Sequence, residues 1–407
     1  MDTDRMNRLM KAYRSGLLDD TLPFWIRHSV DSENGGFIFS LDRDGTVVDT
    51  DKPMWIEGRF TWLLATVYDT VEKREEWLKL AKHGIDFMLE HGFDKDGRMF
   101  YSVTREGKPL RKRRYLFSEC FATVALAAYG QASGDEAMVR RAEDLLQLIL
   151  RYSSEPGLPE PKVDAQTRPA RGLGLPMILI NTAQVLRQAT EKTQQATEGA
   201  PPVTERPDYS KLIDEKIDEI DRYLVNREHR CVLEAAGPNG ELIDHFDGRL
   251  LTPGHGIEAA WFILHESRLR GGDHRLTELG CTMLDWMWEI GWDREYGGII
   301  YFRDARGLPV TEYWHNMKFW WPQNEAIIAT LLAYHLTGEE KYFEWHLMAH
   351  DWAHERLPDA EYGEWFGYLH RDGSLCSPLK GNMFKGPFHI PRMQLYCWKL
   401  LEEMIQE

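Results

Sequence analysis

Two patterns of hydrophobic and polar positions alternate along the chain. In the first, apolar residues recur every three or four positions, which is the spacing of a helix with a buried face. In the second, a Gly-bearing turn leads into a short aromatic strand and a polar turn, which is typical of a small β-hairpin. The first pattern predicts helices at roughly 6–30, 53–73, 75–91, 117–132, 135–152, 173–192, 208–226, 254–270, 274–290, 320–336, 340–355 and 390–405.

The hairpin pattern recurs at a nearly fixed period. Its copies read NGGFIFSLDRDG, KDGRMFYSVTREG, NGELIDHFDG, YGGIIYFRDARG and YGEWFGYLHRDG. Their aligned glycines lie 61, 143, 58 and 65 residues apart and are Gly36, Gly97, Gly240, Gly298 and Gly363. Because the long interval is about two short ones, we expect a degenerate sixth copy near Pro156–Pro169. Six units at a fixed period indicate a repeat architecture.

The helical stretches fall into two kinds. Some, such as Cys120–Gly130 and Ala326–Leu336, are apolar on most of their surface and are expected to be buried on both sides, whereas Glu72–Gly84 keeps a polar face. This alternation predicts an all-α fold, an (α/α)6 barrel with short β-hairpins at one end, in a single domain over 1–407. Neither end of the chain resembles the polar cap of an open solenoid. The polar, Pro-bearing segment Thr190–Tyr209 is predicted to be a mobile surface connection.

The composition narrows the classes of function. The chain has 407 residues, of which 43% are hydrophobic, so it can bury a large core. Its formal charge of −16 argues against nucleic acid and anionic membranes as partners. No apolar run reaches the length of about 18 residues that spans a bilayer, and the N-terminal stretch predicts an amphipathic helix and not a secretory signal. Five widely spaced cysteines without a CxxC motif favour a reduced, cytoplasmic protein.

The segment Lys380–Arg392, KGNMFKGPFHIPR, carries the first candidate for chemistry. His389 lies between Pro387 and Pro391, which bias the residues before them toward extended backbone. Pro391 also suits the first turn of a helix. We therefore expect His389 on a stiff loop at the entrance of the last helix, either as a functional group or as a partly buried histidine bonded to its own loop. Lys385 of the same loop is placed among the substrate-binding residues.

The segment PGHGIEAAW (Pro253–Trp261) places a second histidine at the start of a helix. His255 and Glu258 are three positions apart and share one helical face. Since the helix dipole disfavours a charged imidazole at this end, we expect a neutral His255 that can accept a proton, with Glu258 orienting the ring or binding a hydroxyl. A capping pair is the structural alternative. A metal ion would need further ligands, and because the sequence offers no second such pair, we expect none.

Further polar residues are expected at the same end of successive inner helices. Arg59 in WIEGRFTW has apolar neighbours, so it either pairs with a structural carboxylate or holds a substrate oxygen. Trp320 and Trp321 in WWPQNEA offer flat faces that stack on sugar rings, unless they belong to the core. The remaining candidates of this kind are Glu325, Glu119 and Asn181. Together these residues predict a polar small-molecule site at the barrel mouth.

A basic run follows the second hairpin. We interpret it chiefly as a solvated edge, with phosphate binding as the alternative. No GxxxxGK[ST] phosphate loop is present, so a nucleotide would have to bind through scattered cations. Those cations are Arg111, Arg113 and Arg114.

Six motifs, in this order, resemble the N-acylglucosamine 2-epimerase family over essentially the whole chain. They are WIEGRFTW, FSECF, PGHGIEAAW, WWPQNEA, YGEWFGYL and KGNMFKGPFHIPR. FSECF and KGxxFKGPFHxPR favour the N-acetylglucosamine 2-epimerase (renin-binding protein) branch over the cellobiose 2-epimerase and aldose-ketose isomerase branches. The resemblance implies an (α/α)6 barrel, no catalytic metal, no consumed cofactor, ATP or a related nucleotide as an activator, and a homodimer.

The resemblance also implies roles for individual residues. It assigns His255 and His389 as catalytic, with Arg59, Glu258 and Glu325 as supporting site residues. The sugar-isomerising branches carry a third histidine on the inner helix where this chain has Asn181. This chain therefore departs from those branches at that position.

The implied reaction is the reversible epimerisation at C2 of N-acetylglucosamine and N-acetylmannosamine. It requires ring opening, removal of the C2 proton and its return on the opposite face, for which histidine suits because its pKa lies near working pH. We expect His389 to remove the proton, His255 to open the ring or return the proton, and Arg59 to stabilise the enediolate. The alternatives are epimerisation or isomerisation of unacylated sugars (mannose, glucose, cellobiose), a glycoside hydrolase that uses paired carboxylates, and a non-catalytic partner-binding protein.

Overall fold

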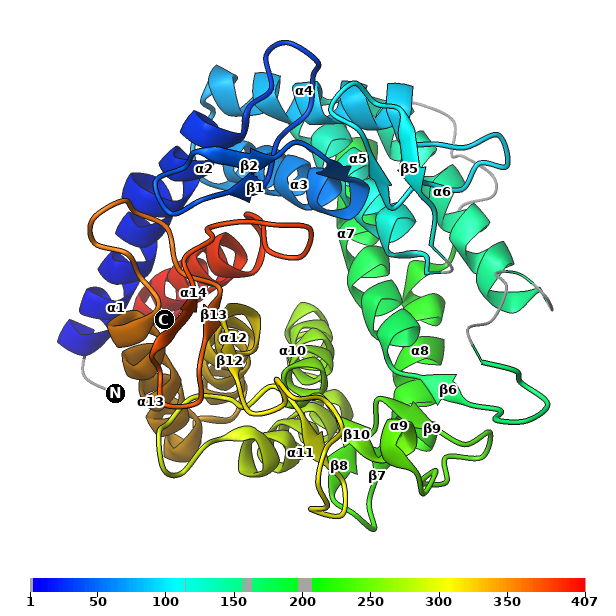
Figure 1. Ribbon diagram of the computed structural model, residues 1–407, viewed down its shortest axis with the longest axis vertical. Helices are drawn as coiled ribbons and strands as arrows, with labels where there is room; N and C mark the ends of the chain where they lie inside the picture. The colour runs from blue at the N-terminus through cyan, green and yellow to red at the C-terminus, as the bar shows by residue number, and fades with distance from the viewer. Residues whose placement is uncertain (1–2, 114, 156–157, 159–162, 197–206, 407) are drawn as a thin grey trace.

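The computed structural model describes residues 3–113, 115–155, 158, 163–196 and 207–406. Two concentric rings of helices surround the middle of the molecule (Figure 1). The inner ring consists of α3 (Met54–Thr70), α5 (Phe117–Ser133), α7 (Gly174–Ala196), α10 (Pro253–Leu269), α12 (Trp320–Thr337) and α14 (His389–Gln406). The outer ring consists of α1 (Thr3–Ser15), α4 (Glu75–His91), α6 (Glu136–Ser154), α8 (Tyr209–Tyr223), α11 (His274–Gly291) and α13 (Glu340–Arg356). The predicted (α/α)6 barrel is confirmed.

The inner helices are covered on both sides. Every residue of α12 from Trp320 to Ala333 is buried, because α10 and α14 flank it in the ring and α13 packs outside it. Close approach in the ring depends on small residues. A Cβ at Gly58 of α3 would lie 2.7 Å from the backbone of Phe121 in α5. Only glycine therefore lets these two helices meet at this distance.

Two predicted helices differ from the observed ones. The predicted helix 6–30 is divided into α1, a π-helical turn η1 (Gly16–Thr21) and α2 (Leu22–Ser29). Pro23 lies in the first turn of α2, where its missing N–H is tolerated, but it would interrupt one continuous helix. The helix predicted at 173–192 continues to Ala196, so the beginning of the predicted surface connection is helical. Residues 197–206 lie outside the described part of the chain.

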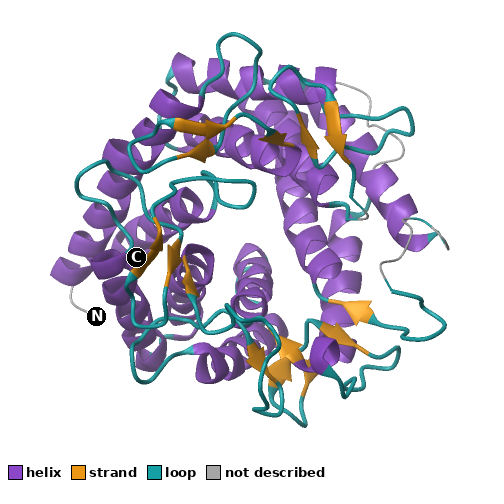
Figure 2. Ribbon diagram, in the orientation of Figure 1, coloured by secondary structure: helices purple, strands orange, loops and turns teal. Residues whose placement is uncertain are grey.

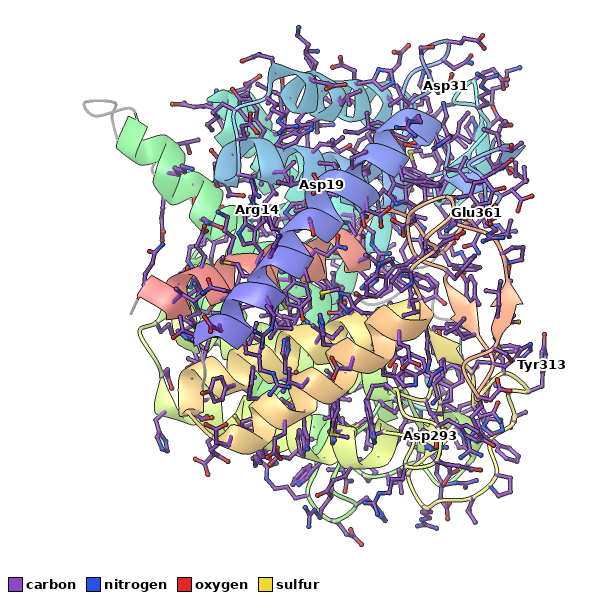
Figure 3. The ribbon with its side chains drawn as sticks, turned by 90° about the vertical axis from the view of Figure 1, so that its left-hand side faces the viewer. Arg14, Asp19, Asp31, Asp293, Tyr313 and Glu361 are labelled. Atoms are coloured by element: carbon purple, nitrogen blue, oxygen red, sulfur yellow. The ribbon has the colours of Figure 1, made fainter. Side chains whose placement is uncertain are left out.

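Short strands gather at one end of the barrel (Figure 2). They are β1 (Ser40–Leu41), β2 (Val47–Asp49), β3 (Lys52–Pro53), β4 (Ser102–Val103), β5 (Pro109–Arg111), β6 (Arg171–Gly172), β7 (Val225–Asn226), β8 (Cys231–Val232), β9 (Ala235–Ala236), β10 (Leu250–Leu251), β11 (Arg303–Asp304), β12 (Lys318–Phe319), β13 (Tyr368–Leu369) and β14 (Leu375–Ser377). The side view shows Asp31, Asp293, Tyr313 and Glu361 toward this same end (Figure 3). In the predicted sixth copy, residues 156–157 and 159–162 lie outside the described part of the chain, and residues 163–169 form no strand. Strand β6, which follows it, pairs with β9.

An ion cluster of one aspartate, one lysine and one arginine recurs between successive hairpins. Asp31 accepts from the fully buried Lys52 (2.8 Å) and from Arg105 of the next hairpin (2.9 Å). The two other clusters are Asp293, Lys318 and Arg371, and Asp359, Lys380 and Arg43. In the last cluster the arginine comes from the first hairpin. The 2.7 Å pair between Arg43 and Asp359 therefore joins the last repeat to the first and closes the ring.

The length of the helices and the state of the cysteines bear on the cellular compartment of the protein. Among the described residues, no helix combines the length and the apolar character needed to cross a bilayer. All five cysteines are free, and Cys120, Cys231 and Cys397 are buried. Burial raises the pKa of these three thiols, so they stay protonated at neutral pH and act as small apolar core residues.

Candidate active site

A cavity of about 450 Å³ lies at the hairpin end of the barrel, within the usual size range of small-molecule sites. All six inner helices contribute residues from their first two turns, and the hairpins and loops supply the rest. The lining residues are Trp55, Arg59, Phe117, Phe121, Gly174, Met177, Ile178, His255, Glu258, Tyr301, Trp314, Phe319, Trp320, Trp321, Tyr368, Phe384 and His389. The structure thus brings six of the predicted site residues to one cavity.

Glu325 connects His389 to a buried network of charges. Its Oε1 accepts from Nδ1 of His389 (2.6 Å) and from the Arg392 guanidinium (2.7 Å), while its Oε2 accepts from the Trp261 indole (2.6 Å). Arg392 also donates to Glu258 (2.6 Å). All five residues are buried. Glu325 was predicted among the substrate-binding residues, but it does not line the cavity; it lies behind the site and bonds to the histidine that does.

The bond to Glu325 determines which nitrogen of His389 carries a hydrogen. Because a carboxylate can only accept, Nδ1 bears the hydrogen and Nε2 keeps a lone pair. Burial and the positive charges of Arg392 and Arg59 hold the pKa of His389 well below its ordinary value, although Glu258 acts in the opposite direction. His389 is therefore neutral at pH 7, with its basic nitrogen available as a proton acceptor.

His255 has the opposite electrostatic setting. It lies in the first turn of α10, and its Nδ1 is 2.8 Å from Oε1 of Glu234, which lies between β8 and β9. Burial alone lowers the pKa of His255, but the charge and hydrogen bond of Glu234, together with Glu258 and Glu325, raise it above its ordinary value. The helix dipole led us to predict a neutral ring, and this prediction is wrong in direction. The neighbouring carboxylates outweigh burial, which alone would favour the neutral ring.

The two imidazoles share one wall of the cavity. The indole of Trp321 is 4.9 Å from the ring of His255 and 5.8 Å from the ring of His389, measured between centroids. Trp320 packs edge-on against His389 at 6.2 Å. Both tryptophans are nearly buried, yet both line the cavity. Each tryptophan is therefore both a core residue and a cavity-lining residue. The two roles considered for them, core packing and stacking on a sugar ring, do not exclude each other.

Arg59 supplies an arginine side chain to the cavity. Its guanidinium lies over the rings of Trp55 (4.4 Å), Phe121 (4.2 Å) and Phe388 (4.6 Å). Among the described residues, no carboxylate lies within ion-pair distance of it, and its buried Nε has no hydrogen-bond partner. Burial lowers the pKa of Arg59 to about 9, partly offset by the charge of Glu258. An arginine in this setting can stabilise a negative charge that develops in the cavity.

Glu119 has a structural role that the sequence did not reveal. It is fully buried, and its Oε1 accepts from Arg98 (2.6 Å) and from the backbone N–H of Met99 (2.9 Å). Glu57 and Gln323 accept in the same way from the hairpins of their own units. These three side chains anchor hairpins to inner helices, and the structure places Glu119 outside the cavity.

Asn181 and Lys385 also lie away from the cavity. Asn181 is four residues past Met177 on α7, about 6 Å further along the axis, and it lines a separate depression with Gln184 and His265. Lys385 is fully buried and donates to Glu364 (2.9 Å) and to the Lys380 carbonyl (2.6 Å). Neither residue is placed to touch a ligand beside His255 and His389, contrary to the prediction.

The basic run lies at the outer edge of the second hairpin. Arg111 is exposed and borders a shallow groove together with Asp49 and Asp51. Arg113 lies with its guanidinium 4.1 Å from the centre of the Tyr101 ring. Arg114 lies outside the described residues. These contacts are compatible with the predicted solvated edge, and the nucleotide site stays a prediction.

Two residues of the site were missed. Arg392 stands in the quoted motif FHIPR one helical turn after His389, so helical spacing could have indicated it. Glu234 lies 21 residues before its partner His255, in a loop with no distinguishing pattern. No local signal identifies such a tertiary contact.

The carboxylates of Glu258 and Glu325 and a ring nitrogen of His389 lie within 4.8 Å of one another, close enough to surround a cation. The guanidinium of Arg392 already donates to both carboxylates. It supplies the positive charge that a metal ion would bring, so these side chains do not fit a metal centre well.

The fold and the cavity define an (α/α)6-barrel protein whose cavity brings together two histidines, a glutamate and an arginine. The family model for N-acylglucosamine 2-epimerase (GlcNAc 2-epimerase) matches residues 36–388. The N-acylglucosamine 2-epimerase of Bos taurus is 34% identical over 95% of this chain and 90% of its own length, and that of Homo sapiens is 32% identical over 99% and 92%. The chain belongs to the N-acylglucosamine 2-epimerase family.

More distant proteins share the fold. The cellobiose 2-epimerase of Eubacterium cellulosolvens is 24% identical over 96% of this chain and 97% of its own. The solved structure of cellobiose 2-epimerase from Spirochaeta thermophila superposes with a TM-score of 0.83 at 21% identity, covering 98% of both chains. A glycoside hydrolase family 76 α-mannanase from Bacteroides thetaiotaomicron reaches a TM-score of 0.58 at 11% identity, covering 97% of both chains. These two structures show that the barrel architecture is shared.

Proposed function

We propose that the protein is a sugar 2-epimerase that interconverts N-acetylglucosamine and N-acetylmannosamine. The observation that carries the proposal is that His389 and His255 line one cavity together with Arg59. The pKa of His389 is shifted down and that of His255 up, so one ring is suited to accept a proton and the other to donate one. Two relatives named for acylated sugars are 34% and 32% identical, whereas the cellobiose 2-epimerase is 24% identical. This difference supports an acylated substrate. We assign the activity to a single catalytic domain formed by the whole barrel.

The proposed reaction begins with opening of the sugar ring, in which the C1 hydroxyl loses its proton, O5 gains one and C1 becomes an aldehyde. Nε2 of neutral His389 then removes the proton from C2. The electron pair of the C2–H bond forms a C1=C2 double bond, and the π pair of the carbonyl moves to the C1 oxygen. The resulting enolate (an enediolate in an unacylated sugar) is stabilised by Arg59. His255 returns a proton to C2 from the opposite face, and ring closure completes the inversion.

The wall formed by α5 and α7 supports an acylated substrate. It consists of Phe117, Phe121, Met177 and Ile178, and so it offers no hydrogen-bonding side chain. A methyl group buried there gains about 0.8 kcal/mol, whereas a hydroxyl would lose its bonds to water without replacement. Unacylated sugars, the alternative substrates, would present a hydroxyl where this wall favours a methyl.

The network of Arg392, Glu258 and Glu325 disfavours a glycoside hydrolase. Such enzymes need one protonated and one ionised carboxyl group, about 5–5.5 Å or 6.5–9.5 Å apart. Glu258 and Glu325 both accept from Arg392, and Glu325 does not line the cavity. Glu119, the third carboxylate considered, lies outside the cavity. Among the described residues, the cavity is therefore lined by Glu258 without the second carboxyl group that a glycoside hydrolase requires.

Incubation with N-acetylmannosamine in deuterated water tests the proposal. We expect N-acetylglucosamine with deuterium at C2, observed by NMR as loss of the H2 signal, and we expect His389→Asn to lower this exchange by about 10²- to 10⁴-fold. Product without deuterium, or undiminished exchange in His389→Asn, would contradict the mechanism. Parallel assays with mannose and cellobiose decide between the acylated and unacylated substrates.

We also propose a cytoplasmic homodimer that a nucleotide such as ATP activates without being consumed. The free cysteines support a reducing compartment, and the motif resemblance supports the dimer and the activator. Sedimentation velocity tests the dimer. Activity with and without ATP, in the wild type and in Arg111→Ala, tests the activator site.

A further inference from the structure

We infer that Glu234 is a positioning residue that fixes the tautomer and the charge of His255, and thereby makes this imidazole the proton donor of the reaction. The catalytic part of this inference rests on the proposed epimerisation. The physical part, the control of His255 by Glu234, does not. Glu234 does not line the cavity and acts only through its contact with the ring.

The backbone around Glu234 is held on both sides. Its carbonyl accepts from the N–H of Leu173 (3.0 Å), the residue just before α7. The two residues after it form β9, in which Ala235 pairs with Gly172 and Ala236 pairs with Arg171. This pairing aims the Glu234 side chain at the start of α10, where its Oε1 meets Nδ1 of His255 at 2.8 Å. The orientation of the imidazole is thus set by a fixed element.

The site contains two histidine–glutamate pairs that differ in one respect. His389 bonds to Glu325, whose charge is shared with Arg392 at 2.7 Å. His255 bonds to Glu234, and among the described residues no lysine or arginine lies within ion-pair distance of that carboxylate. An unshared carboxylate stabilises an imidazolium, whereas one already neutralised by an arginine does so much less. The two pairs are therefore suited to opposite steps, proton removal at His389 and proton delivery at His255.

Several charged groups surround His255. Glu258 lies on its own helix α10, Glu325 on α12 and His389 on α14, and the indole of Trp321 covers one face of the ring. The N-terminus of α10 opposes a positive charge on the ring. Only Glu234 makes a hydrogen bond to it among the described residues. Removal of the Glu234 charge therefore leaves burial and the helix dipole opposed only by Glu258 and Glu325, whose charges are shared with Arg392.

Glu234→Gln tests the inference, because glutamine keeps the size and a hydrogen-bond acceptor but loses the charge. Histidine-selective NMR titration should show the pKa of His255 lower by about one unit or more. The basic limb of the pH profile of kcat/KM should move down by the same amount, since the reaction needs the protonated ring. The loss should then be about tenfold at pH 8 and small at pH 6, with KM little changed. Glu228→Gln is the matched control, because Glu228 is exposed on the β7–β8 turn of the same hairpin.

The outcomes separate the inference from the proposed function. An unchanged His255 titration in Glu234→Gln overturns the inference, and so does an equal loss of activity at every pH. If the wild type fails to epimerise N-acetylmannosamine, the proposed function fails. The NMR comparison of Glu234→Gln with Glu228→Gln still decides whether Glu234 controls His255.

Discussion

Arg392→Met tests the charge balance at the centre of the barrel. Arg392 is 3% exposed by its side chain and donates to two carboxylates, Glu258 (9% exposed) and Glu325 (fully buried). Methionine keeps an unbranched apolar stem but leaves both carboxylates without their shared cation. Removing one partner of a buried ion pair costs about 3–5 kcal/mol. For a chain of this size the unfolding entropy is about 0.9 kcal/mol/K, so the melting temperature should fall by roughly 3–6 °C.

The loss should depend on pH in a defined direction. In Arg392→Met the pKa of Glu258 or Glu325 rises above its value in the unfolded chain, because two buried negative charges face each other. A carboxyl group with a raised folded pKa destabilises the protein increasingly as pH rises from the unfolded value toward the folded one. The difference in melting temperature between wild type and Arg392→Met should therefore be smaller at pH 5 than at pH 8.

Scanning calorimetry of three proteins provides the assay: wild type, Arg392→Met, and Arg392→Met combined with Glu258→Gln. The second substitution removes one of the two uncompensated charges. The double variant should therefore recover part of the stability that the single variant loses at pH 8. If the double variant is no more stable than Arg392→Met, or if the loss is equal at pH 5 and pH 8, the account of this network is wrong.

Three further predictions follow from separate parts of the structure. Arg59→Met should lower kcat by about 10²- to 10³-fold with little change in KM, because its partner charge exists only in the intermediate; steady-state kinetics with N-acetylmannosamine check this, and a change in KM alone would contradict it. The hydrogen bond from Arg43 holds the pKa of Asp359 well below its ordinary value, so this carboxylate stabilises the fold above about pH 4 and less below it. Asp359→Asn should therefore melt lower at pH 7 and lose less on acidification to pH 3, measured by calorimetry; parallel curves would refute the argument. Met177→Gln should reduce kcat/KM about tenfold or more for N-acetylmannosamine but less for mannose, and an equal reduction for both sugars would remove the acyl wall from the argument.

The fold could be predicted because short stretches of sequence identify each repeat. Glycine turns, short aromatic strands and 3.6-residue periodicity each act over a few residues, and six repetitions leave few architectures that bury the inner helices. The errors occur where tertiary contacts decide. Gly16 packs against Gln394 at the π-helical turn, and an added Cβ would lie 2.6 Å from the amide of that glutamine. The spacing of residues along the chain does not indicate that Gly16 and Gln394 are neighbours.

The site could be predicted only in part, for a similar reason. His255 and His389 stand in first turns of inner helices and Arg59 in a second turn, and the structure brings all three to one cavity. Glu119 stands in a first turn as well, yet its carboxylate anchors a hairpin. Asn181 shares a helix with cavity residues but lies a turn deeper. Periodicity identifies the face of a helix, whereas depth along its axis and the competing backbone partners depend on the assembled barrel.

The pairing of the first helix with the last has a consequence for how the enzyme is made. Outer helix α1 packs on inner helix α14, with Met6, Leu9 and Tyr13 buried, and α14 carries both His389 and Arg392. Neither helix is therefore covered until these two distant segments of the chain meet. Their meeting closes the ring and brings His389 and Arg392 beside the other inner helices. A variant without α14 would lack both residues, and the proposed site with them.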